Sequence, residues 1–374
     1  MVNENKPSIQ QNDIFVDHQE LEAIADCINR RWLSEGPIVG QFAEKISSFT
    51  GSNFTTFAPN GTLGLFLALL ALDLPKGSEV IVPSFTFYAS ATSVIFAGLK
   101  PVFVDVDLET FNVLPEKIEE AITDRTSAIM AIHIYGQACD IGAICEIAKK
   151  RNLKVIEDAA QGFGVKYNGK HVGSIGDIGV FSFFSDKAIT TGEGAAIVTN
   201  HEKIFHRLRF LRNQGRERSS TFIHPELGMN FRITDLQAAV GLTQFSKFPE
   251  ILNRRLKMWA LYENLLSHQE GIQTMKVASF SNLVPFRFLI RTEYKEELCA
   301  FLEQAGIATR SFFYPMHRQP RLQEYAYHAC ENAELLYEQG ICLPVHHHLK
   351  ETDVEYVCST ITTFLEIKRS TVCC

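Results

Sequence analysis

The 374-residue chain has no long run of lysine or arginine, and its formal net charge is −7. A nucleic-acid binder or a protein anchored to an anionic membrane normally carries a basic patch. We therefore expect neither nucleic-acid nor membrane partners, and small molecules become the favoured ligands. With 46% hydrophobic residues, including 28 phenylalanines, the chain is rich enough in apolar side chains to form a large core.

The sequence also lacks a C-x-x-C pair, although it contains nine scattered cysteines. An odd number of cysteines without such spacing argues against a disulfide framework or a zinc site, and favours free thiols in a reducing compartment. The triplet 346–348 consists of three histidines, but we expect no metal there. No signal peptide is expected, because the first residues lack a basic head followed by an apolar stretch.

Long hydrophobic runs are absent too. The most apolar stretch, 63–72, is shorter than the roughly 20 residues that a helix needs to cross a bilayer. Together with the free thiols, this predicts a cytoplasmic protein.

Between about residues 60 and 200, segments with helical periodicity alternate with short apolar segments typical of strands. This alternation predicts an α/β fold in which a mostly parallel sheet is flanked by helices. The stretches FSFF and AAIVTN, at 181–184 and 195–200, differ because a short loop containing glycine joins them. They have the character of a hairpin.

The remainder predicts a second, smaller part. A long helix is expected from Thr234 to about residue 268, with Gln237 completing a capping box. Mixed helical and strand-like segments follow. We therefore expect a large domain at 1–245, including an N-terminal arm, and a small C-terminal α+β domain at 246–374.

Two charged residues stand out at the predicted strand ends. Asp158 ends a mostly apolar strand, and a buried carboxylate needs a cationic or hydrogen-bonding partner. Lys187 lies between the aromatic FSFF segment and the loop TTGEG. The alternatives are a helix N-cap or a structural ion pair for Asp158, and a solvent-facing position for Lys187, since isolated charged residues usually have such roles.

The stretch Asn60-Gly61-Thr62 precedes an apolar helix, where free backbone N–H groups bind phosphate and glycine permits a close approach. An ordinary threonine N-cap is the alternative. A phosphate cradle, a lysine for the aldehyde and an aspartate for the ring nitrogen are together what pyridoxal 5'-phosphate requires. The agreement of the three sites favours this cofactor.

Motifs along nearly the whole chain resemble the DegT/DnrJ/EryC1/StrS family of sugar aminotransferases, which have the type I fold of pyridoxal-phosphate-dependent transferases. The similar stretches, in chain order, are WLSEGPIVGQFAE (32–44), NGTLGLFLAL (60–69), VIVPSFTFYASA (80–91), PVFVDVD (101–107), HIYGQACDI (133–141), VIEDAAQGFG (155–164), FSFFSDKAITTGEGAAIVTN (181–200), GMNFRITDLQAAVGL (228–242) and FFYPMH (312–317).

The resemblance implies roles for individual residues. Lys187 would bind the cofactor's aldehyde covalently and carry the proton during catalysis. Asp158 would pair with the ring nitrogen, Gln161 would bind the 3-hydroxyl oxygen, and Phe87 would stack on the ring. The phosphate would be held by four further residues, namely Ser182 and the backbone of Gly61, Thr62 and Leu63.

The resemblance also implies a homodimer, because Asn230 would reach the phosphate of the neighbouring subunit. Two departures from the family pattern, Leu63 after Gly-Thr and Ala195 after Gly194, remove no chemical group from this mechanism.

The implied reaction is transamination, with L-glutamate as amino donor and a nucleotide-linked keto-sugar as acceptor. The segments HIYGQ, TTGEG and YPMH favour amination of the 4-keto carbon of a 6-deoxyhexose, for polysaccharide or glycoconjugate synthesis, over amination of a 3-keto sugar. Members of the family with histidine in place of lysine are dehydratases, so Lys187 argues against that alternative. A non-catalytic regulatory protein is the third alternative.

Candidates for substrate contact are Tyr314, His317 and Arg216, the last with Arg218 as an equivalent choice. A guanidinium group there would meet the diphosphate. Each candidate has a structural alternative, because Tyr314 can pack at a domain interface, His317 can be a satisfied polar residue, and the arginines can be solvated.

Overall fold

The protein is described by a computed structural model that covers residues 9–217 and 220–372. The helices are α1 (His18–Asn29), α2 (Pro37–Thr50), α3 (Gly61–Leu72), α4 (Tyr88–Phe96), α5 (Pro115–Ala121), α6 (Ile141–Arg151), α7 (Glu202–Arg212), α8 (Asp235–Leu266), α9 (Lys295–Gln304), α10 (Glu331–Gln339) and α11 (Glu351–Val372). The strands are β1 (Phe54–Ala58), β2 (Glu79–Pro83), β3 (Lys100–Val104), β4 (Thr126–Ile132), β5 (Lys154–Asp158), β6 (Lys166–Tyr167), β7 (Lys170–His171), β8 (Ile178–Ser182), β9 (Ala195–Thr199), β10 (Gln273–Thr274), β11 (Phe288–Arg291), β12 (Arg310–Ser311) and β13 (Gly340–Leu343).

A seven-stranded sheet forms the centre of the fold, in the order β1-β9-β8-β5-β4-β2-β3. Strands β3, β2, β4, β5 and β8 pair in parallel, and β9 runs antiparallel to both of its neighbours. The strands in the middle of this sheet are buried on both faces, which explains their nearly continuous apolar sequences. The predicted alternation of helices and strands is confirmed between α3 and β5.

The hairpin prediction is confirmed as well, because β8 and β9 are antiparallel neighbours with Ser182 opposite Ala195. The strand containing Phe181 and Ser182 begins earlier than predicted, at Ile178, and ends at Ser182. Strand β1 and helices α1, α2 and α11 were not predicted from the sequence.

Helix α3 packs tightly on the sheet through Gly64. A Cβ atom at Gly64 would lie 2.8 Å from Cγ1 of Val180 in β8, so only glycine permits this approach. The helix begins beside the end of β8 for that reason. Its N-cap is Asn60, whose side chain accepts a hydrogen bond from the Leu63 N–H at 2.9 Å, so Thr62 is not the cap.

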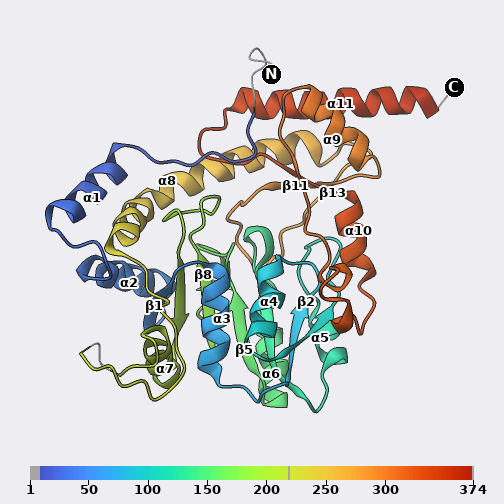
Figure 1. Cartoon of the computed structure of the whole chain (residues 1–374). Coiled ribbons are helices and arrows are strands. Elements are labelled where there is room, and N and C mark those ends of the chain that lie inside the picture. Colours follow the sequence, from blue (N-terminus) through green and yellow to red (C-terminus); the bar gives the residue numbers. More distant parts are fainter. Residues whose placement is uncertain (1–8, 218–219, 373–374) are drawn as a thin grey trace.

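Helix α8 extends between the two parts of the chain (Figure 1), packing against α1 and α2 at one end and against α11 at the other. The predicted capping box of Thr234 and Gln237 is present at its start. A second sheet, in the order β10-β11-β13-β12, is formed by the C-terminal third of the chain. The predicted boundary at 245/246 falls inside α8, and the two-domain division stays a prediction.

The start of the described chain joins this second part. Ile9 forms a parallel bridge with Ile307, and the Gln11 side-chain amide donates to the Cys342 carbonyl in β13 at 2.7 Å. The N-terminal segment therefore lies against the C-terminal part.

No helix in the part of the chain that the structure describes is long and apolar enough to cross a membrane. Seven cysteines lie in that part and all are free thiols, while Cys373 and Cys374 fall outside it.

Candidate active site

A cavity of about 410 Å³ opens where the parallel strands end at their carboxyl edge. Its lining includes most of the cofactor-binding residues predicted from the sequence, which are Gly61, Thr62, Phe87, Asp158, Gln161, Ser182 and Lys187. Strands β5 and β8 are adjacent, so Asp158 and Ser182 reach the same edge of the sheet.

Lys187 follows β8 by five residues and is largely buried, with 16% of its side chain exposed. Its Nζ lies 4.5 Å from the centre of the Phe286 ring and 3.4 Å from Oδ1 of Asp186. Burial lowers the pKa of the Lys187 amino group below its ordinary value of 10.5, although Asp186 opposes the change. A lowered pKa increases the fraction of neutral amine, which is the nucleophilic form.

Asp158 ends β5 and is 6% exposed. Its Oδ2 accepts a hydrogen bond from Ser90 Oγ at 2.8 Å, and its Oδ1 accepts one from the Ala160 N–H at 3.1 Å. Both donors are neutral, and burial raises the pKa of Asp158 in spite of them. A cation in the cavity would stabilise the carboxylate, so the site suits a protonated ring nitrogen.

Gln161 is fixed by its carbonyl oxygen, which accepts a hydrogen bond from the Tyr135 N–H at 2.6 Å. This arrangement leaves the amide NH₂ group as the donor facing the cavity. Tyr135 has a φ of 51°, in the left-handed region that disfavours side chains, and the bond to Gln161 helps to hold it there.

The end of β8 and the start of α3 lie together where the sequence predicts a phosphate cradle. A Cβ atom at Gly61 would lie 3.1 Å from Cβ and 3.2 Å from Oγ of Ser182, so glycine lets the helix start approach that hydroxyl. The N–H groups of Gly61 and Thr62 belong to the first turn of α3, where they have no partner within the helix. The Leu63 N–H already donates to Asn60, and Leu63 does not line the cavity.

Glu157 anchors the end of β5 behind the cavity. This fully buried carboxylate accepts hydrogen bonds from His133 Nε2 at 2.9 Å and from the backbone N–H groups of Gly173, Ile175 and Gly176. Burial favours the neutral acid, but these donors hold the pKa of Glu157 below its ordinary value. His133 also lines the cavity, so this pair fixes one wall of the site.

The remaining sequence candidates lie outside the cavity lining. Asn230 is exposed, and its Oδ1 accepts from the Arg232 N–H at 3.2 Å. Arg216 donates to the Gln214 side chain at 2.9 Å, while Arg218 lies outside the described residues.

Two candidates from the segment FFYPMH have protein partners instead. Tyr314 packs edge-on against Tyr337, with ring centres 4.9 Å apart. His317 is buried, and its two ring nitrogens bond to Ser84 Oγ at 2.7 Å and to Glu334 at 2.8 Å. This geometry favours the structural interpretation for both residues.

Phe87 lines the rim of the cavity and is 59% exposed. Its ring lies edge-on to Phe313, with centres 6.1 Å apart, and Phe313 in turn stacks on Tyr135. An aromatic wall at this position can cover a planar ring.

Sequence reasoning missed several residues that the second part of the chain contributes to the cavity, which are Phe286, Arg287, Arg310, Ser311, Phe313 and Cys342. No spacing in the sequence connects them to Lys187. Phe313 lies within the stretch FFYPMH (312–317), and the resemblance of that stretch to the family is the one available signal.

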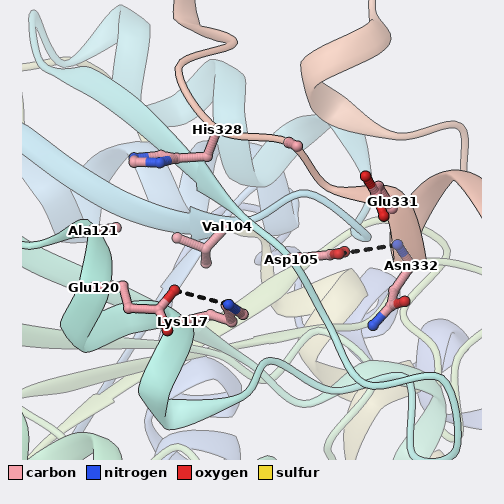
Figure 2. A pocket seen from close by; sticks show the side chains of 9 residues that line it. Val104, Asp105, Lys117, Glu120, Ala121, His328, Glu331 and Asn332 are labelled. Atoms are coloured by element: carbon pink, nitrogen blue, oxygen red, sulfur yellow. Dashed lines mark hydrogen bonds and ion pairs between the residues drawn. The ribbon is translucent and has the colours of Figure 1, made fainter.

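A second cavity, of about 390 Å³, lies between the β3 end of the sheet and α10. Figure 2 shows Lys117 bonded to Glu120, and the Asp105 carboxylate accepting from the backbone N–H of Asn332 at the start of α10. The same carboxylate also accepts from the Ala333 N–H. Asp105 therefore links the large sheet to the C-terminal part. Lys117 is 43% exposed and paired with Glu120, whereas Lys187 is largely buried, so the site around Lys187 remains the candidate active site.

Comparison with known proteins agrees with this geometry. Residues 15–362 match the DegT/DnrJ/EryC1/StrS aminotransferase family. GDP-perosamine synthase from Escherichia coli O157:H7 is 38% identical, over 94% of this chain and 96% of its own. UDP-2-acetamido-2-deoxy-3-oxo-D-glucuronate aminotransferase from Pseudomonas aeruginosa is 34% identical, over 87% and 90%. The crystal structure of S. venezuelae DesV, 30% identical, superimposes with a TM-score of 0.91 over 96% of this chain and 99% of that one.

Fold and site together define an aminotransferase whose cofactor is pyridoxal phosphate, with the predicted type I fold. The chain belongs to the DegT/DnrJ/EryC1/StrS aminotransferase family.

Gly61→Ala should weaken the binding of pyridoxal phosphate, because the added methyl group would push against Ser182. Loss of one charge-assisted hydrogen bond costs about 1.5–3 kcal/mol, or roughly 10- to 150-fold in the dissociation constant. Titration of cofactor-free protein by absorbance measures the change. Gly40→Ala in α2 is the matched control, since a Cβ there meets nothing within 4 Å. If both variants bound pyridoxal phosphate with equal affinity, the proposed phosphate-binding role of the start of α3 would be contradicted.

Proposed function

We propose that the protein transfers an amino group from L-glutamate to a keto-sugar carried on a nucleoside diphosphate. The 4-keto carbon of a 6-deoxyhexose is the proposed acceptor, and the amino sugar would serve polysaccharide or glycoconjugate synthesis. Support for the acceptor comes from the relative named GDP-perosamine synthase, with which this chain shares 38% of its residues. The observation that carries the proposal is the largely buried Lys187 in one cavity with Asp158 and Gln161.

Asp158, Gln161 and Lys187 would each have a separate role in the reaction. When bound, pyridoxal phosphate supplies an aldehyde and a ring that accepts electrons. Asp158 would keep a proton on the ring nitrogen, and the NH₂ group of Gln161 would donate to the ring's 3-oxygen. Lys187 would hold the aldehyde carbon covalently between turnovers and, once released as a neutral amine, would move a proton at the substrate carbon.

Amination of a 3-keto sugar is the second candidate, because the P. aeruginosa relative is named as the aminotransferase of a 3-oxo sugar. Both candidates need the same lysine, and they differ in how the sugar lies in the cavity. The presence of Lys187 supports transamination over dehydration in either case.

Homodimer formation is part of the proposal. The segment 220–230, which contains Asn230, exposes large apolar side chains, with Phe222, Ile223 and Leu227 exposed by 87%, 74% and 98%. Apolar groups of this size are normally covered by a partner. A second copy of the chain would cover them and would bring Asn230 and Arg216 to the neighbouring site. The free thiols support a cytoplasmic location.

Incubation with L-glutamate and a panel of GDP-, UDP- and dTDP-linked 4-keto and 3-keto sugars tests the reaction. Mass spectrometry should detect one product in which an amine replaces the carbonyl, together with 2-oxoglutarate. The Lys187→Ala variant should form neither product. Turnover of glutamate without amination of any sugar would contradict the proposed acceptor.

A mixture of the Lys187→Ala and Asn230→Ala variants tests the shared site. Each variant alone should be impaired, whereas random reassociation should restore about one quarter of the wild-type activity, because half of the dimers gain one intact site. Activity that stays at the average of the two variants would contradict a site built from two subunits.

A further inference from the structure

A buried group of polar side chains lies beside Lys187, and the proposed reaction does not use it. Arg287, which precedes β11 and is 4% exposed, donates from Nη2 to Oδ2 of Asp186 at 2.9 Å. Its Nη1 donates to Oε1 of Gln11 at 2.6 Å. The group therefore joins three segments: the N-terminal segment, the loop after β8 and the C-terminal part.

Asp186 presents its other oxygen to the lysine. Oδ1 of Asp186 lies 3.4 Å from Nζ of Lys187, and 13% of the Asp186 side chain is exposed. Among the described residues this buried oxygen has no hydrogen-bond donor. A buried acceptor without a donor is unfavourable. A small rotation of the lysine side chain would supply the donor.

Among the described residues, Asp186 is the carboxylate within 4 Å of the Lys187 amino group. Other cationic and aromatic side chains surround the pair. Arg310 approaches Oδ2 of Asp186 at 3.8 Å, and Arg255 donates to the carbonyl oxygen of Lys187 at 3.1 Å. The Phe286 ring covers the amino group at 4.5 Å. The charged side chains with the largest effects on the Lys187 amino group are Asp186, Arg287 and Asp158, and Glu193 and Arg310 also line the cavity.

We propose that Asp186 is a positioning residue that binds the amino group of Lys187 whenever the lysine is not attached to the cofactor, and that Arg287 limits the strength of this ion pair. The inference rests on the proposed function, because a transamination cycle releases and recaptures the lysine at every turnover. Arg287 donates to the same carboxylate. Its positive charge therefore weakens the ion pair between Asp186 and Lys187, so that the lysine can leave Asp186 to react with the cofactor.

Asp186 and Arg287 have opposite effects on the pKa of Lys187. Burial lowers the pKa of Lys187 most, Asp186 raises it, and Arg287 lowers it. Removal of the Asp186 charge should therefore move the titration of the lysine to lower pH. Removal of the Arg287 charge should move it to higher pH, because Asp186 would then pair with the lysine alone.

The pH dependence of cofactor attachment to cofactor-free protein tests the inference. Only the neutral amine attacks the aldehyde, so the attachment rate, followed by visible absorbance, rises as Lys187 loses its proton. The midpoint pH of this rise should fall for Asp186→Asn and rise for Arg287→Gln. Moving the midpoint by about one pH unit changes the ratio of neutral to charged lysine roughly tenfold at a fixed pH. Asp186→Glu should return the midpoint toward the wild-type value.

Asp73→Asn is the matched control, since it makes the same chemical change at a side chain that is 75% exposed and remote from the cavity. It should leave the midpoint unchanged. General damage to the fold would move Asp186→Asn and Arg287→Gln in the same direction. Midpoints that move in one direction, or that stay in place in either variant, would overturn the inference.

The attachment assay contains neither amino donor nor sugar, so it separates the two proposals. Opposed changes of the midpoint in a protein that aminates no sugar would support the ion pair and contradict the proposed reaction. Parallel or absent changes in a protein that aminates a sugar would contradict the ion pair alone.

Discussion

Lys187 and Asp158 are ionisable side chains that share one cavity and are both largely buried. The rest of the site depends on how the charges of these two groups are stabilised away from water. Burial lowers the pKa of Lys187 and raises that of Asp158, so each side chain is held away from its ordinary protonation behaviour. Neutral donors, Ser90 and the Ala160 N–H, offset only part of the burial of Asp158. A cationic ring nitrogen on the cofactor would supply the missing counter-charge and would join these two residues in one site.

The fold satisfies this constraint by bringing distant segments to one edge of the sheet. Adjacent parallel strands β5 and β8 place Asp158 and Ser182 at the same end. The close packing of α3 on β8, which Gly64 allows, brings the start of that helix to Ser182. The C-terminal part then closes the cavity through Phe286 and Arg287. The charged and polar groups of the site thus lie at or next to the ends of strands in the large sheet and the second sheet.

Local patterns were sufficient to predict most strands of the large sheet and to single out Asp158 and Lys187 near strand ends, because periodicity depends on neighbouring residues. The roles of Ser182, Gln161 and Phe87 came from the family resemblance. Contacts between distant segments were not predictable in this way. Arg287 is 101 residues from Asp186 in sequence, and only the packed second sheet brings them together. The segment FFYPMH was correctly placed near the site by its resemblance, but Phe313 lines the cavity while Tyr314 packs on Tyr337. Such a choice between neighbouring side chains depends on the packing of the strand that precedes them.

The central claim is that Lys187 is the residue to which pyridoxal phosphate is covalently attached. Borohydride reduction of the cofactor-loaded protein, followed by peptide mapping with mass spectrometry, tests it most directly. The account predicts one reduced cofactor per chain, on the peptide that contains Lys187, and no such peptide from the Lys187→Ala variant. Attachment to a different lysine in the wild-type protein, or undiminished labelling of the variant, would contradict the account.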